Sequence, residues 1–429
     1  MGQKISSGGD MDDAVITLIV LGVVSFLFIT ELIPIAITAL SATVVLALCG
    51  VLTTKEAFSG FSNSTVILFA GMFVVGAAML DSGLAQAIGN YVVRKVGTNE
   101  VPLMIALMIV TIFMSAFASN TGTVACLLPM VIGICVSAKI PCSALLMGLA
   151  VAANTGCNLT MVGTPPNMLA NAALENAGFP MFGFFEFTII GGPIALCCLV
   201  FMVTVGRKML PRHKAELGAV SSYDGPVGSS RQRWEALLIL AFVIAGLIIG
   251  IPGVSPSMVA VIGALVCVLS GCITEKQAYQ GIDWVTIFLF AGMLPIATAL
   301  EKTGAGQMVA ETVVGFMGEN PSGTTIMAVL FLLSCGLTQF MPNTATAALL
   351  IPIGLSISQQ INASPLAVTM GITIAASCSF ATPVATPPNT LIMTPGGFHF
   401  VDYIKVGLPM CLISFVLCVL IVPVAWPFH

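Results

Sequence analysis

The chain has 429 residues, of which 58% are hydrophobic and only 7% are charged, and its mean hydropathy is +1.07. Soluble domains carry about 25% charged residues, so this composition excludes a soluble protein. The apolar runs are continuous and roughly 18–20 residues long, which predicts membrane-spanning helices rather than the alternating strands of a β-barrel. The net charge is only −4, so the positions of the few charges carry more information than their sum.

Apolar runs form two series on either side of a polar segment. The first series covers residues 14–30, 35–52, 64–81, 101–118, 122–139, 142–160, 164–176 and 187–206. The second covers residues 234–251, 256–272, 284–300, 324–340, 344–360, 365–382, 386–394 and 402–426. We therefore predict one half at 1–206, a hydrophilic linker at 207–233 and a second half at 234–429.

The two series match each other piece by piece. The stretch "GVLTTKEAFSGFSNSTVILFAGM" from Gly50 corresponds to "GCITEKQAYQGIDWVTIFLFAGM" from Gly271. Further along, "GTPPN" from Gly163 corresponds to "ATPPN" from Ala385. A match of this length indicates an internal duplication, which is typical of secondary transporters.

The basic residues indicate that the repeats are inverted. If each Thr-Pro-Pro-Asn segment breaks a single span, each half crosses the membrane five times and the halves have opposite orientations. A hairpin there would give an even number of crossings and parallel repeats. The broken span puts eleven basic residues on one face and three on the other, whereas the hairpin gives nine and five.

Basic residues concentrate on the cytoplasmic side of membrane proteins. We therefore predict an all-α polytopic protein of two inverted repeats with five crossings each, a cytoplasmic linker and both termini outside, in a bacterial inner (plasma) membrane. The three outer residues would be Lys4, Lys55 and Lys302. The eleven cytoplasmic residues would be Arg94, Lys95, Lys139, Arg207, Lys208, Arg212, Lys214, Arg231, Arg233, Lys276 and Lys405.

Four polar breaks interrupt the apolar runs, as two matched pairs. One pair is Asn120-Thr121 and Asn343-Thr344, and the other holds the Pro-Pro dipeptides that begin at Pro165 and Pro387. Non-helical backbone at membrane depth persists only against protein or a water-filled cavity. In inverted halves the four breaks can meet near mid-membrane, where helix N-termini suit anions and C-termini with unwound carbonyls suit sodium.

Charged residues are absent from all four breaks. A proton pump would be expected to bury an acidic residue, so we favour a coupling ion held by neutral oxygens, and sodium is the natural candidate. Asp81 and Asp283 stand at span ends, and we interpret them as boundary residues. The thirteen cysteines and three histidines show no metal-binding spacing, and no catalytic constellation lies in the spans, so we do not expect an enzyme.

At these motifs the chain resembles the divalent-anion:sodium symporter family, within the broader ion-transporter superfamily. Members carry di- and tricarboxylates or sulfate. The resemblance covers nearly the whole chain and is carried by the Ser-Asn-Thr motif and the Gly/Ala-Thr-Pro-x-Asn breaks. It implies re-entrant hairpins at 101–139 and 324–360, broken helices around 160–167 and 382–389, and a homodimer that moves substrate by an elevator-like shift of a transport domain.

The resemblance also implies the binding residues. The first sodium ion would be held by Ser115, Ser119, Asn120 and the backbone of Gly163, and the second by Thr338, Met341, Asn343 and Ala385. The anion would meet Asn120, Thr121, Thr164, Asn343, Thr344, Thr386 and Pro387. One departure affects the second site, because Pro342 stands where the family pattern has serine and so removes an N–H and a hydroxyl.

Together these observations predict a sodium-coupled symporter that imports a small divalent anion, with a C4-dicarboxylate such as succinate, malate or fumarate favoured. Two alternatives stay open within the same family: a transporter of sulfate or another oxyanion, and a sodium-independent anion exchanger. A proton-coupled antiporter would need a titrating acid at the site. A channel would use the same half-helices around an open pore.

Overall fold

The computed structural model describes residues 9–30, 32–84, 87, 95–97, 99–138, 140–212, 229–317 and 322–428. Most of the predicted linker lies outside these ranges, as do the basic residues Lys4, Arg94, Lys139 and Lys214. Helix continues at one end of the linker to Met209 and resumes at Ser230, four residues before the predicted start of the second half. This earlier start follows from a capping box, in which the Ser229 hydroxyl accepts from the Gln232 N–H and the Gln232 side chain accepts from the Ser229 N–H.

The described chain is built from helices, as predicted. The first half contains α1 (Gly9–Thr30), α2 (Ile35–Leu48), α3 (Thr54–Ala57), the 3-10 turn η1 (Ser59–Ser62), α4 (Ser64–Asp81), α6 (Glu100–Ser115), α7 (Asn120–Ala138), α8 (Ser143–Gly156), α9 (Pro165–Asn176), α10 (Thr188–Phe201), the π-turn η2 (Met202–Gly206) and α11 (Arg207–Met209). The second contains α12 (Ser230–Ile249), α13 (Pro256–Leu269), α14 (Glu275–Gly281), α15 (Trp284–Lys302), α16 (Ala305–Met317), α17 (Gly323–Leu337), α18 (Asn343–Gln360), α19 (Pro365–Ala376), α20 (Pro387–Gly396) and α21 (Phe400–Ala425).

Six helical segments of the described chain are long and apolar enough to cross a membrane. They lie in α1, α4, the continuous stretch from α10 to α11, α12, α15 and α21. Helices α2 and α13 have 14 residues each, which corresponds to about 21 Å. These eight segments and the two broken pairs α8–α9 and α19–α20 make up the ten predicted crossings, and the number of crossings itself stays a prediction.

Equivalent helices of the two halves run in opposite directions. The end of α4 at Asp81 and the start of α15 at Asp283 line one cavity. At the other end, the Lys302 ammonium that closes α15 contacts the carbonyl of Val51 and the carboxylate of Glu56, both just before α4. Contacts are also exchanged between halves: α4 packs on α13 while α15 packs on α2, and α7 packs on α20 while α18 packs on α9. This is the inverted duplication predicted from the sequence.

The repeated "FAGM" sequence marks two close helix crossings. A Cβ atom added to Gly71 of α4 would lie 2.7 Å from the carbonyl carbon of Ala260 in α13. The equivalent Gly292 of α15 would place one 2.7 Å from the carbonyl carbon of Ala39 in α2. Small residues of this kind allow helix backbones to approach in membranes. Each glycine therefore joins a helix of one half to a helix of the other.

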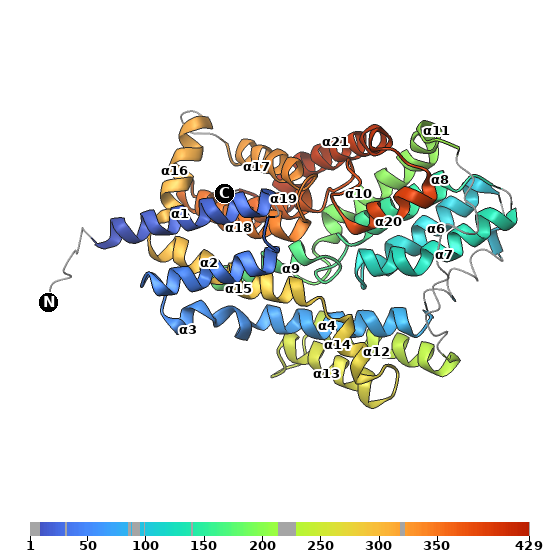
Figure 1. Cartoon of the computed structure of the whole chain (residues 1–429), viewed down its shortest axis with the longest axis horizontal. Helices are drawn as coiled ribbons and strands as arrows, with labels where there is room; N and C mark the ends of the chain where they lie inside the picture. Colours follow the sequence, from blue (N-terminus) through green and yellow to red (C-terminus); the bar gives the residue numbers. More distant parts are fainter. Residues whose placement is uncertain are drawn as a thin grey trace.

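The helices divide into two blocks, which we call the first block (α1–α4 and α12–α15) and the second block (α6–α10 and α17–α21). In Figure 1, α4, α12, α13 and α14 lie along the bottom, α10, α17 and α21 lie along the top, and α9 lies between them. Helix α9 packs on α4 and α15 of the first block and on α18 and α19 of the second. The blocks therefore meet around α9.

Helix α16 does not correspond to any predicted run. It follows α15 and packs on α18 of the second block. Its sequence, "AGQMVAETVVGFM", mixes apolar residues with Gln307 and Glu311, so it lacks the continuous hydrophobicity on which the predicted runs depend. The short helices α3 and α14 escape prediction for a similar reason, because each is only four to seven polar-rich residues long.

Candidate transport site

All four predicted breaks are places where one helix ends and another begins. Helices α6 and α17 end at Ser115 and Leu337, and α7 and α18 begin at Asn120 and Asn343. Helices α8 and α19 end at Gly156 and Ala376, and α9 and α20 begin at the paired prolines. Proline is well suited to the first helical position because it lacks the N–H that would be unpaired there. The breaks therefore supply four helix N-termini and four C-termini.

Matching hydrogen bonds join the tip of each helix pair to the break beside it. In the first half, the Ser115 hydroxyl donates to the Ala153 carbonyl at 2.7 Å, and the Thr160 hydroxyl donates to the Ala116 carbonyl. In the second half, the Thr338 hydroxyl donates to the Ala376 carbonyl at 2.6 Å, and the Thr382 hydroxyl donates to the Gln339 carbonyl. Each tip is thus fixed to its neighbouring break by side-chain hydroxyls on both sides.

The asparagines of the Thr-Pro-Pro-Asn motifs fix the unwound segments. The Asn167 amide donates to the Thr160 carbonyl at 2.8 Å, and the Asn389 amide donates to the Thr382 carbonyl at 2.8 Å and to the Ser379 carbonyl at 2.9 Å. Both asparagines are buried. Since unwound backbone has carbonyls without helical partners, these amides satisfy groups that would otherwise be costly to bury.

A chain of three asparagines connects the two halves. The Asn120 amide donates to the Asn154 side-chain oxygen at 3.1 Å, and the Asn154 amide donates to the Asn389 side-chain oxygen at 3.1 Å. Asn154 is only 1% exposed. The Asn120 oxygen also accepts from the backbone N–H of Thr121 at 2.8 Å. The first Asn-Thr break is therefore in contact, through Asn154, with the Thr-Pro-Pro-Asn break of the opposite half.

The first Asn-Thr break opens into a cavity of about 590 Å³, which we call the break cavity. Its lining includes the predicted site residues Ser119, Asn120, Thr121, Gly163 and Pro387. Among the described residues, no arginine or lysine lines it. The volume is in the range of small-molecule sites. The structure therefore brings residues from three of the four breaks to one space.

The second Asn-Thr break is arranged differently. The Asn343 oxygen lies 2.9 Å from the Thr338 hydroxyl, which shares its single proton between this oxygen and the Ala376 carbonyl. The Asn343 acceptor therefore faces its own helix pair rather than an asparagine of the other half. Asn343 and Thr344 are half-buried and do not line the break cavity, and Met341, Thr164, Thr386 and Ala385 are buried. The roles of the predicted sodium and anion ligands stay predictions.

Buried polar atoms without a partner concentrate near the four breaks. Within the described chain, the hydroxyls of Thr123, Thr346, Ser377 and Ser379 and one oxygen of Asn167 are buried and make no hydrogen bond. Such atoms are rare in native proteins, and they often mark the place of a bound ion or an ordered water molecule. Neutral hydroxyl and amide oxygens are the ligand type that the sequence predicts for sodium.

Two carboxylates also line the break cavity, and neither belongs to one of the four polar breaks. Asp81 ends α4, and Asp283 caps α15, where its side chain accepts from the Thr286 N–H at 3.2 Å. This cap agrees with the interpretation of Asp283 as a boundary residue. Asp81 shares the lining with Gln277 of α14. The charged part of this lining is therefore acidic, so an anion that enters needs positive charge from another source.

At the opposite end of the block interface, hydrogen bonds join the blocks. The Glu175 carboxylate at the end of α9 accepts from the Ser64 hydroxyl at 2.7 Å and from the Thr65 hydroxyl at 3.0 Å, both in the first turn of α4. The Asn63 amide donates to the Asn176 side-chain oxygen at 3.1 Å. A carboxylate near a helix N-terminus is favourable. We call these contacts the α4–α9 latch.

Several of these residues are not apparent from the sequence. Asn154 lies in an apolar run outside any recognised motif, and a polar residue among "GLAVAANTG" is the available signal. Gln339 is buried and donates to the carbonyls of Cys335 and Cys378 at 2.8 Å each, which joins the second tip to its break. Glu175 stands at the end of a short run, where acidic residues are common and carry no special signal.

An all-helical membrane protein with inverted repeats and a polar cavity at broken helices is a transporter of the secondary type. The chain matches the family described as citrate transporter over residues 25–369 and 322–428, and it belongs to that family. The resemblance to the divalent-anion:sodium symporters is confirmed at this level.

Characterised and uncharacterised relatives cover nearly the full chain. The uncharacterized transporter YfbS of Escherichia coli is 25% identical and covers 95% of this chain and 98% of its own length. An uncharacterized transporter of Haemophilus influenzae is 29% identical over 93% of this chain and 89% of its own length. The sodium-dependent dicarboxylate transporter SdcS of Staphylococcus saprophyticus is 26% identical over 92% of this chain and 83% of its own length.

Two solved structures share the fold. The YdaH transporter of Alcanivorax borkumensis, which was described as having an unusual topology, aligns with a TM-score of 0.67 at 15% identity over 97% of both chains. MtrF of Neisseria gonorrhoeae, from a class of antimetabolite efflux pumps, aligns with a TM-score of 0.58 at 16% identity over 88% of this chain and 83% of its own. At these identities the likeness concerns the fold alone.

Proposed function

We propose that this chain is a sodium-coupled symporter that imports a small divalent anion, with a C4-dicarboxylate such as succinate, malate or fumarate as the favoured substrate. The observation that carries the proposal is the Asn120–Asn154–Asn389 chain beside a cavity whose described lining contains no basic residue. Amide and hydroxyl groups can donate to carboxylate oxygens, and their oxygens can bind sodium. The sodium-dependent dicarboxylate relatives support the same assignment.

Sodium would bind first, at Ser115, Ser119, Asn120 and Gly163, with a second ion at Thr338, Met341, Asn343 and Ala385. Its positive charge would offset the acidic lining contributed by Asp81 and Asp283. A dianion could then bind at Asn120, Thr121 and Pro387, and the four helix N-termini would add further positive potential. Thr164, Asn343, Thr344 and Thr386, which belong to the same block, would complete the set of anion ligands.

The alternating step would be an elevator-like displacement of the second block against the first. The break cavity lies between the blocks, since Asp81 and Gln277 belong to the first and Asn120 and Pro387 to the second. The α4–α9 latch must then open during each cycle. A homodimer and a cytoplasmic linker remain part of this proposal.

The experiment is uptake of labelled succinate into proteoliposomes under an imposed gradient. An inward sodium gradient should drive accumulation, and replacement of sodium by choline should reduce uptake to the level of empty liposomes. Labelled sulfate and citrate, tested in parallel, should accumulate less than succinate. Equal succinate uptake in choline would instead support a sodium-independent exchanger, and preferred sulfate uptake would support an oxyanion transporter.

A further inference from the structure

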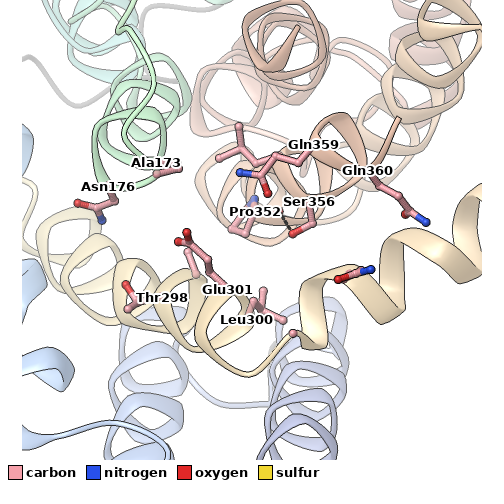
Figure 2. Close-up of a pocket in the computed structure, with 14 residues that line it drawn as sticks. Ala173, Asn176, Thr298, Leu300, Glu301, Pro352, Ser356, Gln359 and Gln360 are labelled. Carbon is pink, nitrogen blue, oxygen red and sulfur yellow. Dashed lines mark hydrogen bonds between the residues drawn. The ribbon is translucent and has the colours of Figure 1, made fainter. Parts of the chain in front are cut away.

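A second cavity, of about 360 Å³, lies between the blocks away from the breaks. Helices α15 and α16 form one side, and α9 and α18 of the second block form the other. We call it the amide cavity, because its polar lining includes Asn176, Gln307, Gln359 and Gln360. Figure 2 shows Glu301 on α15 reaching toward Gln359 on α18, with Asn176 at the end of α9 beside them.

Among the residues that the structure describes, Glu301 is the only charged one that lines this cavity. Its carboxylate makes no hydrogen bond or ion pair with any described residue, and it is exposed. The neighbouring Lys302 does not neutralise it, because the Lys302 ammonium contacts the Val51 carbonyl and the Glu56 carboxylate, each at 3.2 Å. No described basic residue therefore neutralises the Glu301 carboxylate.

Two hydroxyl groups in the lining of the amide cavity provide further hydrogen-bond acceptors beside the Glu301 carboxylate. The Thr298 hydroxyl donates to the Leu294 carbonyl at 3.3 Å, and the Ser356 hydroxyl donates to the Pro352 carbonyl at 3.1 Å. Each hydroxyl has used its proton on its own helix, so its oxygen can only accept from a ligand. The last turns of α9, α15 and α18 also line the cavity, and helix C-termini carry partial negative charge.

We propose that the amide cavity binds a small monovalent organic cation with several N–H donors, of the guanidinium class. A volume of about 360 Å³ is too large for a bare metal ion and falls in the range of small organic ligands. A guanidinium group offers five N–H donors in a plane and can form a bidentate pair with a carboxylate such as that of Glu301. The surrounding amide and hydroxyl oxygens accept from the outer N–H groups.

Such a ligand would contact both blocks at once. Glu301 and Thr298 belong to α15, whereas Ser356 and Gln359 belong to α18. A bound cation would therefore resist relative displacement of the blocks and would slow transport. Because the break cavity is lined by different residues, this inhibition would be noncompetitive with the transported anion. The inhibitory effect, unlike the binding, rests on the proposed function.

Calorimetric titration of the purified full chain in sodium-free buffer without dicarboxylate tests the binding directly. The probes are butylguanidinium, N-butylurea, which keeps N–H donors without the charge, and tetramethylammonium, which keeps the charge without N–H donors. We expect saturable binding of butylguanidinium alone. The E301Q variant should weaken it at least tenfold, and Gln359→Ala should weaken it about threefold, which is roughly 0.6 kcal/mol.

The matched control is Glu275→Gln, which removes an exposed carboxylate from α14, outside the amide cavity. It should bind butylguanidinium like the unmodified chain. The proposal is overturned if butylguanidinium does not bind saturably, if N-butylurea or tetramethylammonium binds as well, or if E301Q binds unchanged. Since no transported anion is present, these outcomes do not depend on whether succinate is the substrate.

Discussion

The interface between the two blocks differs at its two ends. Where α4 ends, the break cavity of about 590 Å³ reaches Asn120 and Thr121. Where α4 begins, the Glu175 carboxylate accepts from two hydroxyls of α4, and no break residue lines the amide cavity beside it. The same pair of blocks is thus open at one end and hydrogen-bonded at the other. The Asn-Thr break of the first half therefore borders a cavity only at the end of the interface where α4 ends.

The largest expected effect comes from Asn154, which links the open cavity to the other half. Asn154→Ala removes two hydrogen bonds and leaves the buried oxygen of Asn389 without its donor, at about 1–3 kcal/mol. We expect sodium-driven succinate uptake in proteoliposomes to fall by about tenfold to a hundredfold. Thr155→Ala is the control, because the Thr155 hydroxyl bonds only within its own helix. Similar losses in both variants would contradict the role of the asparagine chain.

The displacement of the second block against the first also requires the first block to be rigid. Gly71→Ala and Gly292→Ala each force a methyl group against backbone of a helix from the other half, and overpacking of this kind costs about 1–3 kcal/mol. We expect both to lower the Tm of the detergent-solubilised protein. Gly133→Ala in α7 is the control, because nothing lies within 4 Å of the added Cβ. An unchanged Tm in both variants would show that these helix crossings do not stabilise the first block.

The α4–α9 latch can be disrupted by a substitution that leaves the break cavity unchanged. Glu175→Ala removes the acceptor of the Ser64 and Thr65 hydroxyls and should destabilise the α4–α9 latch by about 1–2 kcal/mol. Hydrogen exchange at the start of α4 and the end of α9 should then rise about fivefold to thirtyfold. Exchange at the first turn of α7, which lines the open cavity, should rise much less. Equal increases at both ends would mean that Glu175 stabilises the whole fold rather than one end of the interface.

The smallest expected effect concerns the difference between the two Asn-Thr breaks. Ser119 accepts from the Gly122 N–H at 3.0 Å, whereas its counterpart Pro342 makes no side-chain hydrogen bond. Pro342→Ser should restore that cap, and we expect sodium to activate uptake at about twofold to threefold lower concentration. The sodium dependence of initial uptake rates measures this. A raised sodium requirement would show that Pro342 is adapted to its site.

The positions of the four breaks and the inversion of the halves follow from the sequence because they depend on local chemistry and charge. Paired prolines cannot lie inside a regular helix but suit the first positions of a new one, and the distribution of basic residues does not depend on packing. The contacts of Asn154, Gln339 and Glu175 could not be predicted in the same way. Each depends on which residue of a distant helix lies opposite, and a single polar residue in an apolar run does not reveal its partner.

The difference between the two Asn-Thr breaks is likewise only partly visible in the sequence. Pro342 stands in place of serine, but nothing in the sequence indicates that Asn343 accepts from Thr338 while Asn120 bonds to Asn154. Helix α16 and the amide cavity beside it also escape prediction, because the cavity is formed by ends of helices from both blocks.

The most direct test is titration calorimetry of succinate binding to the purified chain, in sodium chloride and then in choline chloride. It shows whether a cation makes the break cavity attractive to a dianion. We predict saturable binding in sodium, at least tenfold weaker binding in choline, and loss of the sodium-dependent binding in Asn154→Ala. Equal affinity in the two salts would contradict the account, because the charge of the anion would then be balanced by the protein alone.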